Sequence, residues 1–74
     1  MNKMIAVFRS KSDTIAFYQR LQKGGIKVRN RSIPSYLKMP CGICVEFDTS
    51  DFHLIKKLLS YSGYKSFVGF YPAN

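Results

Sequence analysis

Residues Ile33–Phe47 read IPSYLKMPCGICVEF, and this stretch joins two predicted strands with no helix between them. Pro34 ends the strand that precedes this stretch, and residues 35–40 form a loop. Pro-Cys-Gly then leads into an alternating apolar run. Proline has no amide hydrogen, so Pro40 fits best outside a ladder or at its edge. Gly42 has no Cβ, so a ligand or another backbone can approach Cys41 closely. The stretch therefore predicts both the middle of the fold and a candidate site.

The residues before this stretch predict a strand, a helix and a second strand. Lys3–Arg9 is apolar at successive positions, as in a central strand covered on both faces. Thr14–Lys23 has helical spacing, with Ser10 among its candidate N-caps and a Gly-Gly pair at its end. Ile26–Ser32 alternates, which is typical of a half-buried strand. Its outer face carries three cations, and these are Lys27, Arg29 and Arg31.

The residues after the loop predict a third strand, a second helix and a fourth strand. Gly42–Asp48 alternates, with Cys44 and Glu46 on the face away from the helices. Asp51–Ser62 has an apolar helical stripe, and Thr49 or Ser50 is the predicted cap. Lys65–Tyr71 is the last predicted strand.

The order β-α-β-β-α-β predicts an α+β, ferredoxin-like fold over residues 1–74 as a single domain. Right-handed crossovers place both helices on one face of a four-stranded antiparallel sheet. We expect the strands in the spatial order fourth, first, third, second. The basic strand, second along the chain, is then an edge strand.

Composition narrows the classes of partner and site. Twelve Lys and Arg against four Asp and Glu give a net charge of +8, which favours anionic partners. No apolar run is long enough for a membrane span or a secretory signal, so we expect a cytoplasmic protein. Two cysteines do not make a disulfide-rich scaffold, and with the single His53 they do not supply four zinc ligands. No metal or cofactor is expected.

The predicted topology gives Cys41 a distinctive environment. The start of the third strand lies beside the end of the first, so Cys41 is expected near Ser10 and the N-terminus of the first helix. Such a position, with Lys38 and Arg31 nearby, favours a thiolate. Cys44 is more simply a small buried side chain. In extended chain the two Cα atoms are about 10 Å apart, which is too far for a disulfide. Redox chemistry of the pair would require Cys41 to curl back, and we rank it second.

The chain resembles the selenium/sulfur (Se/S) carrier protein-like family of small bacterial proteins. The resemblance rests on the order of the elements, the Gly24-Gly25-Ile26 helix end, Pro34, and the Cys41-Gly42 pair that heads a strand. Two positions depart from the family pattern: Ser32 replaces a first proline, and Ser35 stands where arginine is usual. If that arginine holds an anion, its substitute here is one of three cations, namely Arg29, Arg31 or Lys38.

The resemblance implies a non-enzymatic carrier whose partners are sulfur- or selenium-donating and accepting proteins. Cys41 would accept the chalcogen atom, with Gly42, Cys44, Pro40, Ser10 and Lys38 as supporting residues. One alternative is a basic binding module for single-stranded nucleic acid or an acidic protein, in which Lys27, Arg29 and Arg31 meet exposed rings of Phe67 or Phe70 on the open sheet face. The other is a homodimer through that face, which we rank above nucleic acid.

Overall fold

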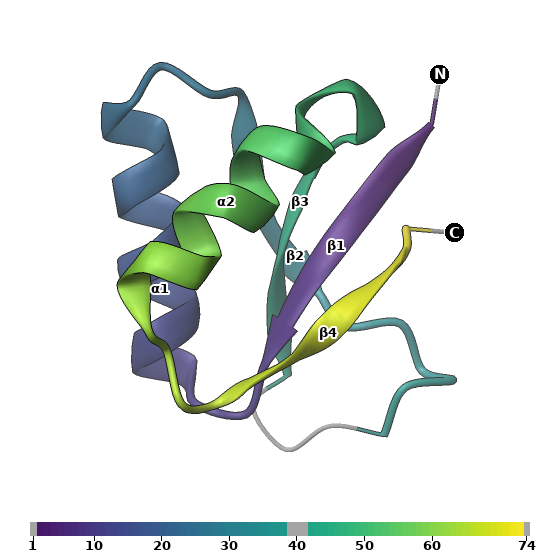
Figure 1. Ribbon diagram of the computed structural model, residues 1–74. Coiled ribbons are helices and arrows are strands. Elements are labelled where there is room, and N and C mark those ends of the chain that lie inside the picture. The colour runs from purple at the N-terminus through teal and green to yellow at the C-terminus, as the bar shows by residue number, and fades with distance from the viewer. Residues whose placement is uncertain (1, 39–41, 74) are drawn as a thin grey trace.

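The predicted order of elements is confirmed in the computed structural model, which describes residues 2–38 and 42–73. The elements are β1 (Lys3–Phe8), α1 (Lys11–Lys23), β2 (Val28–Ser32), β3 (Ile43–Asp48), the 3-10 turn η1 (Thr49–Asp51), α2 (Phe52–Ser62) and β4 (Phe67–Pro72). The fold is the α+β, ferredoxin-like arrangement, as Figure 1 shows.

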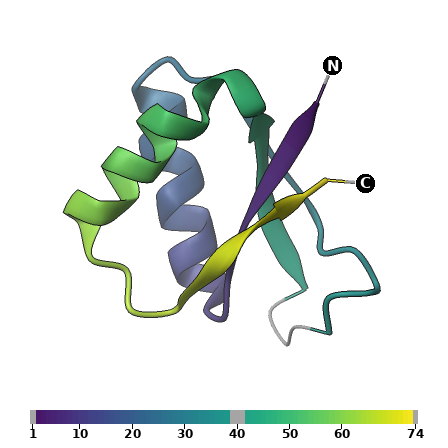
Figure 2. The same cartoon turned by 45° about the vertical axis from the view of Figure 1, so that its right-hand side comes forward.

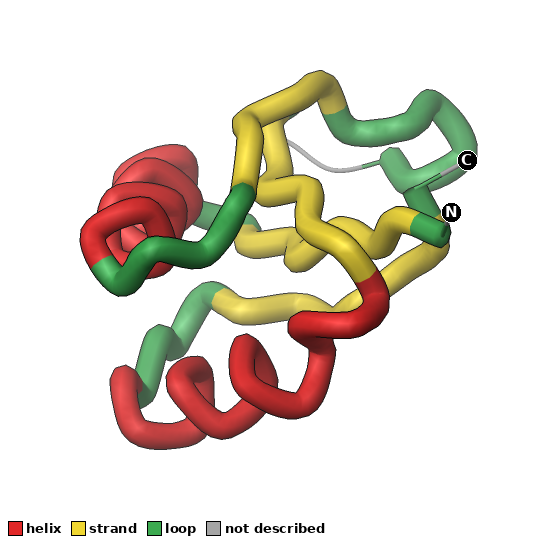
Figure 3. The backbone as a smooth tube through the Cα atoms, turned by 90° about the horizontal axis from the view of Figure 1, so that it is seen from above, coloured by secondary structure: helices red, strands yellow, loops and turns green. Residues whose placement is uncertain are grey.

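The four strands form one antiparallel sheet in the order β2-β3-β1-β4, which is the predicted order. β2 is accordingly an edge strand and β1 a central one. Val45 of β3 lies opposite Ala6 of β1, while Glu46 lies opposite Arg29 of β2. Both helices lie on the same side of the strands (Figure 3). The basic strand therefore pairs directly with the strand that contains Cys44.

The helix ends follow from local sequence, with two corrections. The first is that α1 begins at Lys11, three residues before the predicted start. The Ser10 hydroxyl caps α1 by accepting a hydrogen bond from the Asp13 amide at 3.3 Å. The Gly-Gly pair ends α1, and Gly25 has a φ of 81°, which an L side chain rarely adopts. The predicted cap at Thr49 or Ser50 is wrong, because both residues lie inside η1 and the start of α2 has no side-chain cap.

The core between the helices and the sheet is rich in aromatic rings. Phe8 lies at its centre, with ring centroids 5.4 Å from Phe17, 5.5 Å from Tyr64 and 5.3 Å from Phe67. The predicted stripe of α2 is confirmed, with Ile55 and Leu59 buried in this core. Tilted and edge-on rings at these separations are favourable beyond their buried area. This core fixes the helices on the sheet.

The opposite face of the sheet has a second, smaller core. Its buried members are Ile5, Val7, Cys44 and Ala73, and the partly buried residues that pack on them are Ile33, Leu37, Val68 and Tyr71. The connection from β2 runs out on this side, away from the helices (Figure 2). Ile33 and Leu37 bring that connection onto the sheet. The helix-free face is thus covered in part by the chain itself.

β4 does not follow plain alternation. Its pairing with β1 shifts register between Val7 and Phe8, which is a bulge or similar irregularity. As a result Phe67 and Phe70 both pack in the helix-side core, with ring centroids 5.0 Å apart. The prediction that Phe67 or Phe70 offers an exposed ring on the open face is therefore wrong.

Candidate functional site

The basic edge strand is bound to an acidic side chain on its neighbour. Glu46 accepts a hydrogen bond from Arg31 Nη1 at 2.9 Å, and its other oxygen lies 3.5 Å from Arg29 Nε. The Glu46 side chain is only 11 % exposed, so most of its carboxylate is out of solvent. A buried carboxylate requires such partners. Two of the three predicted anion-binding cations are therefore engaged within the chain.

Arg31 makes a further contact that could not be predicted from the sequence. The same Nη1 atom donates to the carbonyl oxygen of Ala73 at 2.7 Å, so Arg31 links β2, β3 and the residue after β4. Arg29 differs, since its side chain is 75 % exposed. Lys27 is exposed and precedes β2. Arg29 and Lys27 are thus the members of the predicted stripe that face solvent most freely.

Glu46 is the residue of this site that sequence reasoning missed. The available signal was an acid in the middle of an apolar strand whose neighbour carries arginines two residues apart. The strand register decides the pairing, since Arg29 lies directly opposite Glu46. Opposite charges across a ladder are favourable.

Cys44 is fully buried in the helix-free core. Its Sγ lies 3.9 Å from the carbonyl oxygen of Ser32, within reach of a weak S–H···O hydrogen bond. It faces away from the helices as predicted, but it is not at the surface. An apolar, solvent-free environment disfavours the thiolate and excludes reagents. These observations are those of a structural cysteine.

Gly42 stands at the entrance to β3 with a φ of 77°, in the left-handed region. A Cβ built on it would meet nothing within 4 Å, so the space around this residue is open. Its carbonyl oxygen accepts a hydrogen bond from the Ile33 amide at 3.1 Å, which continues the β2–β3 pairing. The predicted site residues Pro40 and Cys41 lie outside the described residues, and their roles stay predictions.

The other two predicted supporting residues, Ser10 and Lys38, lie in different connections of the fold. Ser10 caps α1, and its hydroxyl also lies 2.9 Å from that of Ser12. Because β3 runs antiparallel to β1, its first residues lie toward the end of β1 from which α1 starts. Ser10 and Gly42 therefore belong to the same end of the sheet, as expected. Lys38 is exposed in the connection after β2.

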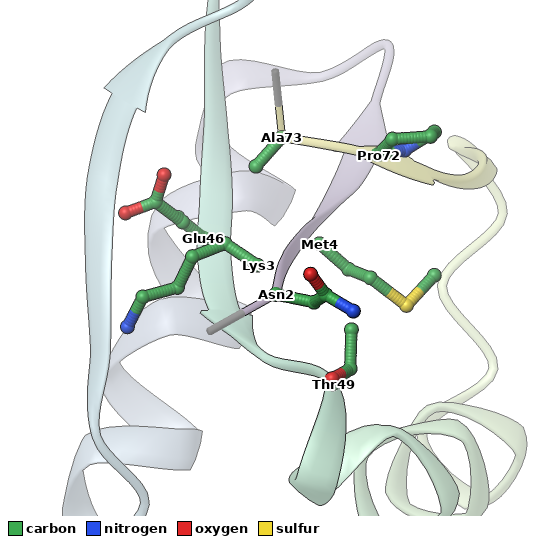
Figure 4. Close-up of a pocket in the computed structure, with 7 residues that line it drawn as sticks. All are labelled: Asn2, Lys3, Met4, Glu46, Thr49, Pro72 and Ala73. Carbon is green, nitrogen blue, oxygen red and sulfur yellow. The ribbon is translucent and has the colours of Figure 1, made fainter.

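A pocket of about 370 Å³ opens at the opposite end of the sheet (Figure 4). Asn2, Lys3, Met4, Glu46, Thr49, Pro72 and Ala73 line it. Of the predicted site residues within the described ranges, none lines this pocket. Its Glu46 carboxylate already pairs with Arg31 and Arg29, and Lys3 Nζ lies 2.7 Å from Asp48 Oδ1. The pocket shares Glu46 with the arginine contacts of β2, but it lies away from the end of the sheet where β3 begins.

Residues 2–38 and 42–73 contain neither a metal-binding cluster nor a membrane-spanning helix. In these ranges no group of three or more His, Cys, Asp or Glu side chains could hold a metal ion. Likewise, no helix in the described part of the chain is long and apolar enough to cross a membrane.

Comparison with known proteins agrees with the resemblance seen in the sequence. No curated protein and no solved structure matches the chain. A family model described as "Putative Se/S carrier protein-like" matches residues 3–67, which is most of the chain. The match runs from the start of β1 to the start of β4 and includes the Cys41-Gly42 pair. The chain belongs to the Se/S carrier protein-like family.

Proposed function

We propose that the chain carries one sulfur or selenium atom on Cys41, which it receives from a donor protein and gives to an acceptor protein. The observation that carries the proposal is the burial of Cys44. The chain has two cysteines, and one of them is sealed in the helix-free core. Within a family named for chalcogen carriage, the reactive role then falls to Cys41.

The transfer needs no external oxidant or reductant. The Cys41 thiolate attacks the terminal sulfur of a persulfide on the donor, so a new S–S bond forms at Cys41. The S–S bond of the donor breaks, and the donor cysteine leaves as a thiolate. The acceptor thiolate then attacks the terminal sulfur on Cys41 in the same way and regenerates the Cys41 thiolate. Selenium follows the same course with an S–Se bond.

The described neighbours of Cys41 support this role. Gly42 leaves open space on its exposed side, which suits the approach of a second protein. The end of β1 and the start of α1 bring cations and helix amides to this end of the sheet. A positive environment stabilises the thiolate and the anionic persulfide. Residence in the cytoplasm belongs to the same proposal, since reducing conditions keep Cys41 available as a thiol.

The test is the intact mass of protein purified from cells under non-reducing conditions, before and after mild reduction. We expect a fraction that is heavier by one sulfur or selenium atom, and reduction should remove this added mass. Peptide mapping should place it on Cys41, and Cys41→Ser should lack it while Cys44→Ala keeps it. An added atom on Cys44, or none under conditions that preserve a known persulfide protein, would contradict the proposal.

A further inference from the structure

Three exposed cations lie at the end of the sheet where β1 finishes. Arg9 and Lys11 belong to the β1–α1 junction, and Lys65 belongs to the turn between α2 and β4. Both turns lie side by side at the lower edge of Figure 1 and again in Figure 2. We call these three residues, Arg9, Lys11 and Lys65, the basic end.

Hydrogen bonds hold the two turns of the basic end together. The Arg9 amide donates to the carbonyl oxygen of Ser66 at 2.8 Å. The Ser66 hydroxyl donates to Asp13 Oδ2 at 2.6 Å. Each turn therefore has a fixed position relative to the other, although the cationic head groups extend into solvent. The charge is presented by a rigid part of the fold.

Little negative charge offsets these cations. The chain has four acids, and Asp13 alone lies at this end, where it already accepts the Ser66 hydroxyl. The other acids are placed elsewhere: Glu46 with the arginines of β2, Asp48 with Lys3, and Asp51 at the start of α2. Three cations against one carboxylate leave a local positive potential, which attracts an anionic partner and speeds its encounter.

We propose that the basic end is the surface on which an acidic segment of the donor protein docks. The proposal rests on the function proposed above and names the chemistry of the partner. β3 begins at this end of the sheet, so a donor docked here lies toward Gly42, at the entrance to β3. Docking would thus bring the donor persulfide to Cys41.

The aromatic residues favour a protein partner over a nucleic acid. Phe8, Phe17 and Tyr64 pack edge-on or tilted against one another, so their faces are not free for stacking. Tyr61, in the last turn of α2, is 72 % exposed and offers a single ring. Single-stranded nucleic acids bind on successive stacked rings. Exposed tyrosine and arginine are instead enriched at protein interfaces.

The test compares two persulfide donors of different charge. One is a short glutamate-rich peptide with a cysteine persulfide, and the other has glutamine in place of each glutamate. The rate at which each loads Cys41 is followed by intact mass at low and high salt. The test variant is Arg9→Gln/Lys11→Gln/Lys65→Gln. The matched control is Arg20→Gln/Lys23→Gln/Lys56→Gln, which removes the same charge from other exposed positions.

We expect the acidic peptide to load the wild-type protein about tenfold faster than the neutral one at low salt, with the advantage lost at high salt. The test variant should lose this advantage, and the control should keep most of it. Equal loss in both variants would overturn the docking proposal and leave the carrier function standing, because Cys41 would still load.

Failure of both peptides to load Cys41 would count against the carrier function instead. Docking is then decided by fluorescence anisotropy with a labelled acidic peptide that has no persulfide. Binding that only the test variant loses supports the basic end as a docking surface. Absence of binding overturns the proposal, and so does tighter, salt-sensitive binding of a labelled single-stranded oligonucleotide that depends on the same three cations.

Discussion

The two faces of the sheet are closed in different ways. On one face two helices cover a core of large rings, with Phe8, Phe17 and Phe47 fully buried. On the other face the connection after β2 and Ala73, the residue after β4, cover smaller side chains, among them Val7 and Cys44. The first face is sealed by regular elements and the second by irregular chain. Both faces of β1 are therefore buried, as its continuous apolar sequence predicts.

The two faces also differ in what stabilises them. The helix side buries the larger rings, so most of the hydrophobic stabilisation belongs there. The helix-free side depends on a few polar contacts, chiefly those of Arg31 with Glu46 and Ala73. Cys44 belongs to this second core, while Gly42 lies at its margin with an open surface. The buried Cys44 and Cys41, the cysteine that is proposed to react, are thus only three positions apart in the sequence.

The largest expected effect is on the helix side. Phe17→Ala should lower the free energy of unfolding by about 3–5 kcal/mol, because it removes a fully buried ring that contacts Phe8 and Tyr64. A chain of this length has about 4–11 kcal/mol in total, so the variant should be close to unfolding. Urea denaturation followed by circular dichroism measures the change.

Leu37→Ala is the matched control on the other face. Leu37 is only partly buried, and we expect a loss of about 1 kcal/mol. A larger loss for Leu37→Ala than for Phe17→Ala would reverse the comparison between the two faces.

The second prediction concerns the polar contacts of the helix-free face. Glu46→Gln removes the negative charge between Arg29 and Arg31 and should cost about 1–2 kcal/mol of unfolding free energy. The cost is moderate because the Arg31 side chain remains 32 % exposed and can be hydrated. Arg29→Gln is the control, and with its largely exposed side chain it should cost less than about 1 kcal/mol. Equal losses in urea denaturation would mean that Arg31 does not anchor this face.

The fold was predictable from the sequence because periodicity is local. The strand Lys3–Arg9 agrees with β1 to within one residue, and the spacing of Ile55 and Leu59 gives the buried side of α2. β2 begins two residues later than the alternation indicates. Pro72, expected to follow the last strand, is its final residue, where it pairs with Met4.

The site was less predictable because its features depend on contacts between distant segments. The irregularity in β4 puts Phe67 and Phe70 on the same face of the sheet, and only the pairing with β1 reveals it. The burial of Cys44 depends on Leu37 and Ala73, which come from separate parts of the chain. Alternation correctly predicted the face of the sheet on which Cys44 lies. It could not predict that Cys44 is buried, because nothing local in IPSYLK shows that this segment packs over the sheet.

The smallest expected effect on stability is at Tyr36, in the connection that covers the helix-free face. The Tyr36 hydroxyl donates to the carbonyl oxygen of Pro72 at 3.1 Å, and the Tyr36 side chain is largely exposed. Tyr36→Phe should therefore change the free energy of unfolding by no more than about 1 kcal/mol. Hydrogen exchange of the Ala73 amide, which donates to the Lys3 carbonyl at 3.1 Å, is the more sensitive measurement. Faster exchange in Tyr36→Phe would show that the connection and the tail stabilise each other, and an unchanged rate would show that they do not.

The most direct test of the central claim is the alkylation rate of each cysteine in the folded protein, measured against pH. Cys44→Ser leaves Cys41 alone, and Cys41→Ser leaves Cys44 alone. We predict that Cys41 reacts rapidly and titrates with a pKa below that of free cysteine, because cations and helix amides surround this end of the sheet. Cys44, fully buried, should react only as fast as the protein opens. A Cys44 that is alkylated as fast as Cys41, or a Cys41 that titrates like free cysteine or above it, would contradict the account.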